Sequence, residues 1–289
     1  MHRKFLEGAR KLRRALFFFS IVVVLSSCGG EHYFFHPADS IKSDMRGKGW
    51  NDLTLRTEHF VLASFVNGQI QKGMNLHIYI EGDGNAFDSQ GRVTDDPTPL
   101  KPTALELAVS DQSPATVYLA RPCQYWGADQ SPSCSRYFWT SGRFSEEVVD
   151  SMNTAVTKVV RWLKPSSVTL IGFSGGGAVA TLVAARRTDI ANVITVAGTL
   201  DPDVWMDHHE LPRLRGSLNP KAFASRLGAL KQAHIVGADD KIMPRAVADS
   251  YMAALSPHHK ARVISVPGYD HQCCWAKNWP DLLAKALAN

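Results

Sequence analysis

The sequence predicts an α/β domain with a mostly parallel central sheet and helices on both faces. Three observations indicate this fold class. From about residue 52 onward, short apolar runs alternate with longer amphipathic ones, which is typical of crossover units. A glycine-rich turn, residues 172–176, separates one apolar run from an alanine-rich run. Distinctive polar residues follow three of the apolar runs, where ligands bind in open parallel sheets.

The first residues have the pattern of a secretory signal. Lysine and arginine precede the apolar run 15–24, which is too short to span a bilayer as a permanent anchor. The segment Leu25-Ser26-Ser27-Cys28 resembles a bacterial lipobox, in which the cysteine receives lipid after cleavage. We therefore expect a lipoprotein signal peptide over residues 1–27, lipidation at Cys28 and a tether over residues 28–51. An ordinary signal or an uncleaved anchor with an incidental cysteine is the alternative.

Removal of the signal changes the charge of the chain. The 289 residues have a formal net charge of +5, and residues 1–27 hold six basic residues and one acidic residue, so the remainder is neutral. A neutral domain without a basic run lacks the electrostatic footprint of a nucleic-acid binder. Gly29, rather than an aspartate, follows Cys28, and we expect the lipid anchor to lie in the outer membrane and face the periplasm.

The elements of the domain, residues 52–289, follow from the alternation of apolar and amphipathic runs. The expected strands are residues 59–66, 76–80, 116–120, 167–173, 193–197, 233–236 and 262–266. The expected helices are residues 145–163, 176–187, 220–229, 244–255 and 281–288. Because parallel strands end at one edge of the sheet, residues that directly follow these strands should gather in one site.

Ser174 lies at the centre of a Gly-x-Ser-x-Gly turn between an expected strand and an expected helix. Small neighbours allow the sharp turn that exposes a hydroxyl, and a serine with an adjacent base is a nucleophile. The turn also fits a loose dinucleotide-binding pattern. Dinucleotide binding needs an acidic residue about twenty positions after the turn. In this sequence Asp201 lies farther along the chain than that, which argues against this function.

Two later strands are followed by an acid and a histidine. Asp239 and Asp240 precede Pro244 after one strand, and His271 follows the last strand in the segment Pro-Gly-Tyr-Asp-His. The order Ser, acid, His resembles the α/β-hydrolase superfamily from Leu76 to the carboxyl end, including uncharacterised bacterial lipoproteins. The resemblance implies an α/β-hydrolase fold and a triad of Ser174, Asp240 and His271. Asp201 and Asp239 remain alternative acids.

The resemblance also implies an oxyanion hole built from two backbone N–H groups. One belongs to Gly175, and the other to Asp83 or Gly84 in the loop after strand 76–80. Where the superfamily often has His-Gly, this chain has Glu81-Gly82. Two carboxylates, those of Glu81 and Asp83, therefore lie close to an anionic transition state. Either they hold the loop by hydrogen bonds or the site handles a cationic or hydroxyl-rich group.

Four cysteines other than Cys28 remain: Cys123, Cys134, Cys273 and Cys274. In an oxidising compartment an even set predicts disulfides, and four cysteines allow three pairings. A bond between the neighbours Cys273 and Cys274 has the least favourable geometry. A local bond between Cys123 and Cys134, however, would leave the neighbours to pair with each other or to stay free. A bridge from the aromatic loop 121–139 to this pair would pin the His271 segment. Metal binding is disfavoured, because neither pair has two-residue spacing.

These features predict a serine hydrolase, carboxylesterase-like or lipase-like, that cleaves an ester or thioester through an acyl-enzyme. No metal or organic cofactor is expected, and the substrate is a small-molecule or lipid ester. A peptidase is a weaker variant, because nothing marks a peptide groove. The aromatic loop 121–139 forms either a pocket wall or a small core of its own. The alternative function is a non-catalytic envelope lipoprotein that uses the fold for binding or scaffolding.

Overall fold

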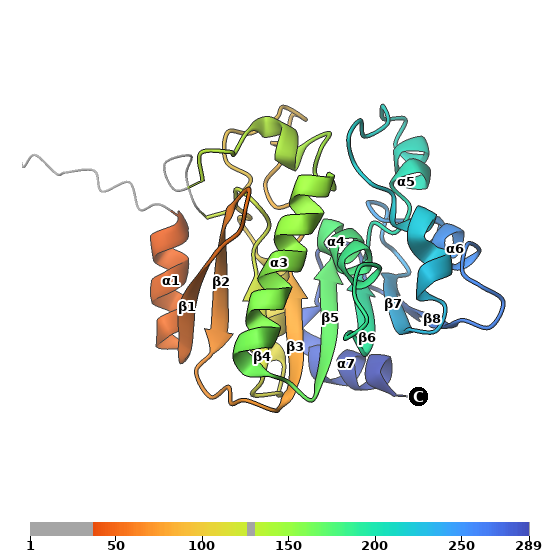
Figure 1. The fold of residues 1–289 in the computed structure, drawn as a ribbon. Helices are drawn as coiled ribbons and strands as arrows, with labels where there is room; N and C mark the ends of the chain where they lie inside the picture. Colours follow the sequence, from red (N-terminus) through yellow and green to blue (C-terminus); the bar gives the residue numbers. More distant parts are fainter. Residues whose placement is uncertain (1–36, 126–130, 289) are drawn as a thin grey trace, which may run out of the picture. The chain divides into compact units, whose positions relative to one another are not determined.

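The structure is a computed structural model that describes residues 37–125 and 131–288 (Figure 1). The expected signal peptide and Cys28 lie outside the described residues, so both stay predictions. Among the residues described, no helix is long and apolar enough to cross a membrane.

A central sheet of eight strands organises the domain (Figure 1). The strands are β1 (Trp50–Arg56), β2 (Val61–Asn67), β3 (Asn75–Ile80), β4 (Thr116–Leu119), β5 (Ser167–Phe173), β6 (Asn192–Val196), β7 (Lys231–Gly237) and β8 (Lys260–Val266). Their order is β1-β2-β4-β3-β5-β6-β7-β8. Strand β2 pairs antiparallel with β1 and β4, and all other pairs are parallel. The mostly parallel sheet predicted from the sequence is confirmed.

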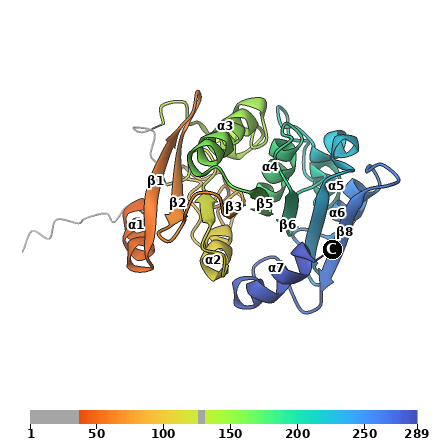
Figure 2. The same cartoon turned by 60° about the horizontal axis from the view of Figure 1, so that its bottom comes forward.

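Helices cover both faces of the sheet, as predicted. The α-helices are α1 (Pro37–Gly47), α2 (Thr103–Ser110), α3 (Glu146–Leu163), α4 (Gly175–Ala184), α5 (Pro202–His208), α6 (Arg245–Met252) and α7 (Trp279–Leu287), and the short 3₁₀ helices are η1 (Arg136–Trp139), η2 (Pro220–Leu227) and η3 (Ala276–Asn278). Helices α3 and α4 lie on one face, and α2 and α7 lie on the other (Figure 2).

Side chains alternate between two apolar cores. In β3, Ile78 and Ile80 join the core beneath α3 and α4, whereas Tyr79 joins the core on the opposite face. This alternation follows from the period of two in a strand. Burial of each large apolar side chain contributes about 1.5–3 kcal/mol, so both faces of the sheet are strongly held in place.

The amino-terminal part of the domain differs from the sequence prediction. Residues 37–51, expected to belong to the tether, form α1 and the beginning of β1. Met45 and Trp50 anchor them, with exposed fractions of 1% and 5%. The tether prediction was wrong for this part because, among residues 40–47 of α1, Met45 is the one buried apolar residue, so the helical period is weak. Helices α2 and α5 were also missed, and residues 220–227 form the 3₁₀ helix η2 rather than an α-helix.

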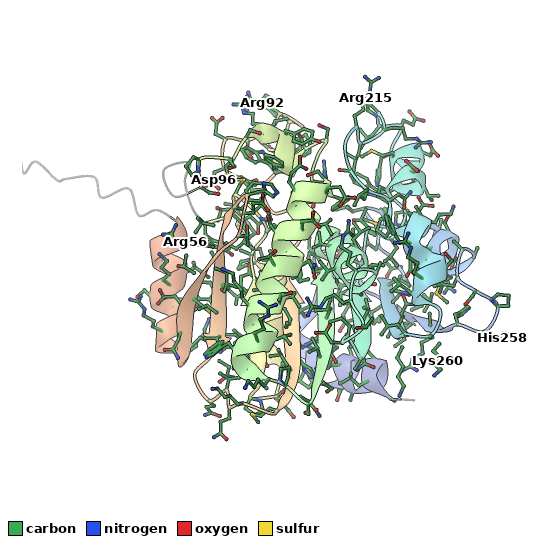
Figure 3. All side chains as sticks on the ribbon, viewed as in Figure 1. Arg56, Arg92, Asp96, Arg215, His258 and Lys260 are labelled. Carbon is green, nitrogen blue, oxygen red and sulfur yellow. A yellow bond between two sulfur atoms is a disulfide. The ribbon has the colours of Figure 1, made fainter. Side chains whose placement is uncertain are left out.

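Charged side chains lie on the outside of the domain at both edges of the sheet. Arg92 and Arg215 project from loops at the carboxyl edge, and Lys260 projects from the amino edge (Figure 3). A charged side chain in the interior, in contrast, needs an ion-pair or hydrogen-bond partner.

Candidate active site

The predicted sharp turn joins β5 to α4. Ser174 lies between them with φ 52° and ψ −121°, a conformation that a residue with a side chain rarely adopts. A Cβ on Gly172 would overlap the carbonyl of Gly176, and a Cβ on Gly176 would overlap the carbonyl of Ile80. Glycine is therefore required on both sides, and the turn raises the Ser174 hydroxyl at the carboxyl edge of the sheet.

A chain of hydrogen bonds connects Ser174 to His271 and Asp240. The Oγ of Ser174 lies 3.1 Å from Nε2 of His271, and Nδ1 of His271 lies 2.9 Å from Oδ2 of Asp240. Because a carboxylate accepts, Nδ1–H of the neutral imidazole donates to Asp240 and Nε2 is left to accept the serine hydroxyl. This is the arrangement in which an imidazole serves as a general base.

His271 is held from several directions. Its imidazole lies 5.2 Å from the ring of Phe173, and its backbone carbonyl accepts a hydrogen bond of 3.1 Å from Nε1 of Trp275. The neighbouring Asp270 accepts hydrogen bonds from the N–H groups of Gln272 and Cys273. These bonds lower the pKa of Asp270 and hold its carboxylate against the loop that follows His271.

The loop after β7 presents one oxygen of Asp240 to His271. The other oxygen, Oδ1, accepts from the N–H groups of Ile242 and Met243 at 2.9 and 2.7 Å. The structure thus places Asp240 against the histidine. Asp201 instead bonds to Ser250, Asn219 and Lys221, and Asp239 is exposed.

The expected oxyanion residues also meet beside Ser174. Gly175 begins α4, and the loop after β3 passes close by, since a Cβ on Gly82 would lie 3.4 Å from Cβ of Ser174. The N–H of Gly82 donates to Oε1 of Glu81 at 2.9 Å. The next N–H groups of this loop belong to Asp83 and Gly84, the two residues predicted from the sequence.

Glu81 holds the loop by hydrogen bonds. Its carboxyl group is buried and accepts from the N–H of Gly82, the N–H of Ala104 and the hydroxyl of Tyr118, at 2.9, 3.2 and 3.1 Å. Burial raises the pKa of Glu81 despite these bonds. Of the two alternatives for this residue, the structure therefore shows the structural one.

Asp83 is paired with two arginines that the sequence analysis did not assign to the site. Its carboxylate lies 2.7 Å from Arg143 and 3.3 Å from Arg121, whose side chains are only 6% and 5% exposed. Burial lowers the pKa of Arg121, against the attraction of Asp83. Two cations face one carboxylate, so Asp83 adds no uncompensated negative charge next to Ser174.

A cavity of 430 Å³ opens beside Ser174 and His271, within the usual range for small-molecule sites. Its wall includes Phe173, Phe87 and Leu100, and the last two are 43% and 85% exposed. Lys101 supplies a cation at the same wall. None of Phe87, Leu100 and Lys101 was predicted, because they follow no strand and no motif.

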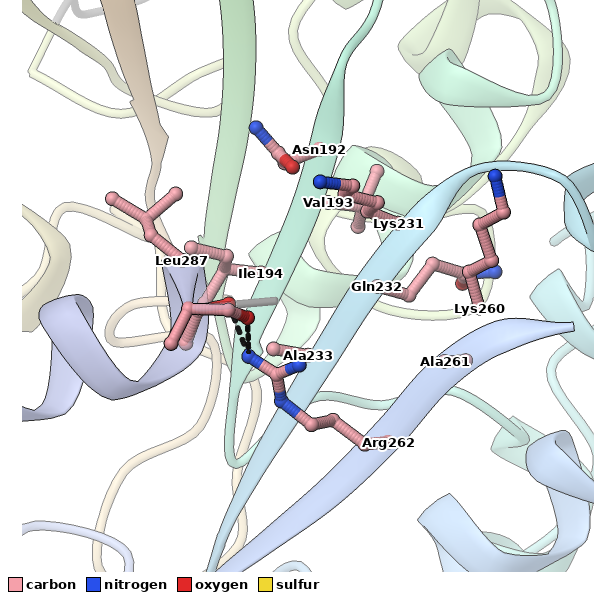
Figure 4. Close-up of a pocket in the computed structure, with 12 residues that line it drawn as sticks. Asn192, Val193, Ile194, Lys231, Gln232, Ala233, Lys260, Ala261, Arg262 and Leu287 are labelled. Carbon is pink, nitrogen blue, oxygen red and sulfur yellow. Dashed lines mark hydrogen bonds between the residues drawn. The ribbon is translucent and has the colours of Figure 1, made fainter.

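A second cavity, of 340 Å³, lies at the amino ends of β6, β7 and β8 (Figure 4). Lys260 and Arg262 line it, and the guanidinium of Arg262 donates to the carbonyls of Lys285 and Ala286 at the end of α7. This cavity is at the opposite edge of the sheet from Ser174. It has no contact with the hydrogen-bonded chain described above.

The four cysteines form two local disulfides, Cys123–Cys134 and Cys273–Cys274. A bridge from the aromatic loop to the His271 segment is therefore wrong. The Cα atoms of Cys123 and Cys134 are 5.6 Å apart, an ordinary disulfide span, and this bond leaves the neighbouring pair only each other. Among the described residues, no group of three or more His, Cys, Asp or Glu side chains is arranged to hold a metal ion.

The aromatic loop packs into the domain rather than into the cavity. Tyr125 and Trp139 are buried in the two apolar cores, and no described aromatic residue of this loop lines the cavity beside Ser174. Of the two sequence alternatives, the structure favours packing over a pocket wall, although Tyr125 and Trp139 join the main cores and not a separate one.

No family model and no curated protein matches this sequence. Solved structures do match. Est1E from Butyrivibrio proteoclasticus aligns with a TM-score of 0.54 at 12% identity, over 82% of this chain and 99% of that protein. An alpha-beta serine hydrolase homologue from Coxiella burnetii aligns with a TM-score of 0.55 at 17% identity, over 82% and 97%. The chain has the α/β-hydrolase fold.

A third α/β-hydrolase neighbour has a different activity in its name. The acylaminoacyl peptidase of Pyrococcus horikoshii aligns with a TM-score of 0.57 at 10% identity, over 84% of this chain and 41% of that protein. The fold predicted from the sequence motifs is confirmed, while the same fold accommodates several substrates. The chemistry of this chain has to be argued from its own site.

Proposed function

We propose that this protein is a serine hydrolase that cleaves an ester or thioester through an acyl-enzyme on Ser174. One observation carries the proposal: the continuous hydrogen-bonded chain from Ser174 through His271 to Asp240, at 3.1 and 2.9 Å. A binding protein has no need for a base within reach of a strained serine. The serine hydrolase homologue among the structural neighbours lends further support.

The reaction proceeds in two halves. His271 takes the proton from Ser174 as Oγ attacks the carbonyl carbon, and Asp240 stabilises the imidazolium that forms. The oxyanion is held by the N–H of Gly175 and an N–H from the loop after β3. His271 then returns the proton to the leaving alcohol or thiol. In the second half a water molecule replaces Ser174 as nucleophile, and the acid is released.

The cavity favours an ester with an apolar part. Phe87 and Leu100 expose apolar surface at its mouth, where an acyl chain or the body of a lipid ester would find contacts. The lipid anchor expected at Cys28 would keep the site near the outer membrane and its esters. The proposed function is therefore that of a carboxylesterase-like or lipase-like enzyme, and its mechanism uses neither a metal nor an organic cofactor.

Labelling with a fluorophosphonate probe, followed by mass spectrometry of the peptides, tests the proposal. We expect the label on Ser174 and hydrolysis of p-nitrophenyl acyl esters by the same preparation. Ser174→Ala should abolish both, and His271→Ala should slow both by about 10³-fold or more. A correctly folded wild-type protein that takes no label would instead support a non-catalytic binding or scaffolding role.

A further inference from the structure

Gln124 is a buried side chain whose amide is bonded at both ends. It is 1% exposed. Its Nε2 donates to the backbone carbonyl of Gly82 at 2.9 Å, and its Oε1 accepts from the backbone N–H of Arg121 at 2.9 Å. The first of these bonds reaches the loop after β3, which lies beside Ser174.

The bond to the Gly82 carbonyl sets the direction of the next N–H. In a planar trans peptide the C=O of one residue and the N–H of the next point in opposite directions. Because Gln124 fixes the carbonyl of Gly82, it also fixes the N–H of Asp83. That peptide is next to the nucleophile, since a Cβ on Gly82 would lie 3.4 Å from Cβ of Ser174.

Gly84, the other candidate for the second oxyanion donor, has different neighbours from Asp83. A Cβ on Gly84 would crowd the carbonyl of Pro97 and Nε2 of Gln124, so this residue packs against the supporting side of the loop. Asp83 is anchored on either side of its own N–H: its side chain is held by Arg121 and Arg143, and the preceding carbonyl is held by Gln124. Asp83 is the better-oriented second donor.

The turn that presents Gln124 is strained. Its two neighbours, Cys123 and Tyr125, have φ angles of 72° and 65°, a region that residues with side chains rarely adopt. The bond Cys123–Cys134 and a 2.7 Å hydrogen bond from the N–H of Tyr125 to Oγ1 of Thr98 hold the turn. Such strain persists only where the surroundings enforce it, and here it places one amide against the Gly82 carbonyl.

We propose that Gln124 is a positioning residue that aims the N–H of Asp83 at the oxyanion of the transition state. The inference rests on the proposed function and extends it to a residue outside the triad. Since an oriented donor acts mainly in the transition state, its loss lowers kcat and leaves KM nearly unchanged.

Gln124→Met tests this with a matched control. Gln232 is likewise buried, at 3% exposed, and bonded at both ends, to the carbonyl of Leu227 and the hydroxyl of Tyr251. We expect Gln124→Met to lower kcat for a p-nitrophenyl ester about 10- to 100-fold, with KM within about threefold. Phosphonylation of Ser174 should slow by a similar factor. Gln232→Met should keep wild-type kcat in its folded fraction. Equal losses in both variants, or wild-type kcat in Gln124→Met, overturn the inference.

Gln124→Glu supplies a second readout that also serves if the methionine variant does not fold. A neutral carboxyl group can donate to the Gly82 carbonyl, whereas a carboxylate cannot. The ratio of variant to wild-type kcat should therefore fall as the pH rises through the pKa of the new glutamate. A ratio that does not change with pH overturns the inference. A wild type that neither hydrolyses esters nor takes the probe defeats the proposed function itself.

Discussion

Two buried aspartates follow adjacent parallel strands and have different environments. Asp201 follows β6 and is 1% exposed, and Asp240 follows β7 and is 6% exposed. Asp240 gives one oxygen to backbone N–H groups and the other to His271. Asp201 caps α5 through the N–H of Asp203 and binds Ser250, Asn219 and Lys221. The Asp240 carboxylate accepts a hydrogen bond from the imidazole of His271, whereas the Asp201 carboxylate is surrounded by donors of the supporting structure.

The comparison shows that an aspartate directly after a parallel strand is not necessarily hydrogen-bonded to the histidine. Burial alone would raise the pKa of Asp201, but the hydrogen bonds from Ser250, Asn219 and Lys221 outweigh it and lower the pKa. Ser250 lies in α6, Lys221 lies in η2 and Asn219 caps η2, while Asp201 itself caps α5, so Asp201 joins three elements. Substitutions at the two positions should therefore affect different properties.

The largest effect is expected for Asp240→Asn. The amide would donate to Nδ1 of His271 and place the imidazole proton on Nε2, where it can no longer accept from Ser174. We expect kcat to fall by about 10³- to 10⁴-fold, while the melting temperature stays close to that of the wild type, because Oδ1 can still accept from Ile242 and Met243. Steady-state ester hydrolysis and circular dichroism measure the two quantities. Near-normal turnover would reassign the acid.

Asp201→Asn should give the opposite pattern. The amide loses the charge that faces Lys221 and turns one acceptor into a donor among three donors. The free energy of unfolding should fall by about 1–3 kcal/mol, measured by urea denaturation, while kcat of the folded enzyme stays within about twofold of the wild type. A large loss of kcat with unchanged stability would contradict the structural role.

The stability difference between wild type and Asp201→Asn should also depend on pH. The folded pKa of Asp201 lies below the ordinary value of 3.8, so the carboxylate's contribution is complete above about pH 4 and disappears as the pH falls through the lower folded value. Urea denaturation at about pH 6 and at about pH 3 should show the difference shrinking in acid. A difference that is constant across this range would show that charge is not the cause.

Asp239→Asn should have the smallest effect. This neighbour of Asp240 is exposed, and surface substitutions usually change stability by less than about 0.5 kcal/mol. We expect kcat and the melting temperature to match those of the wild type in the same assays. A marked loss of kcat would mean that the loop after β7 presents its acids differently from the structure.

The fold and the three residues of the hydrogen-bonded chain could be predicted because their signals are local. Strand β5 is a continuous apolar run, Ser174 stands between glycines directly after it, and Asp240 and His271 follow later apolar runs. Parallel topology then brings these positions to one edge. Helix α1 and strand β1 gave weak signals, because each buries few residues among exposed ones.

The supporting residues could not be predicted from local pattern. Gln124 meets the Gly82 carbonyl across 42 positions, and Arg143 meets Asp83 across 60. Nothing near Gln124 in the sequence indicates that its amide reaches another loop. Likewise, the pairing of Cys273 with Cys274 depends on where the other two cysteines lie. Such contacts are set by packing of the whole domain.

The hydrogen bond between His271 and Ser174 joins residues 97 positions apart, and it has a consequence for folding. His271 follows β8, which is an edge strand and the last strand in chain order among the described residues. Under the proposed function, a growing chain that ends before this segment would have the Ser174 turn but lack His271, so it would be inert toward esters. Long-range contacts of this kind form late and slowly. Catalytic competence would therefore report complete assembly of the sheet.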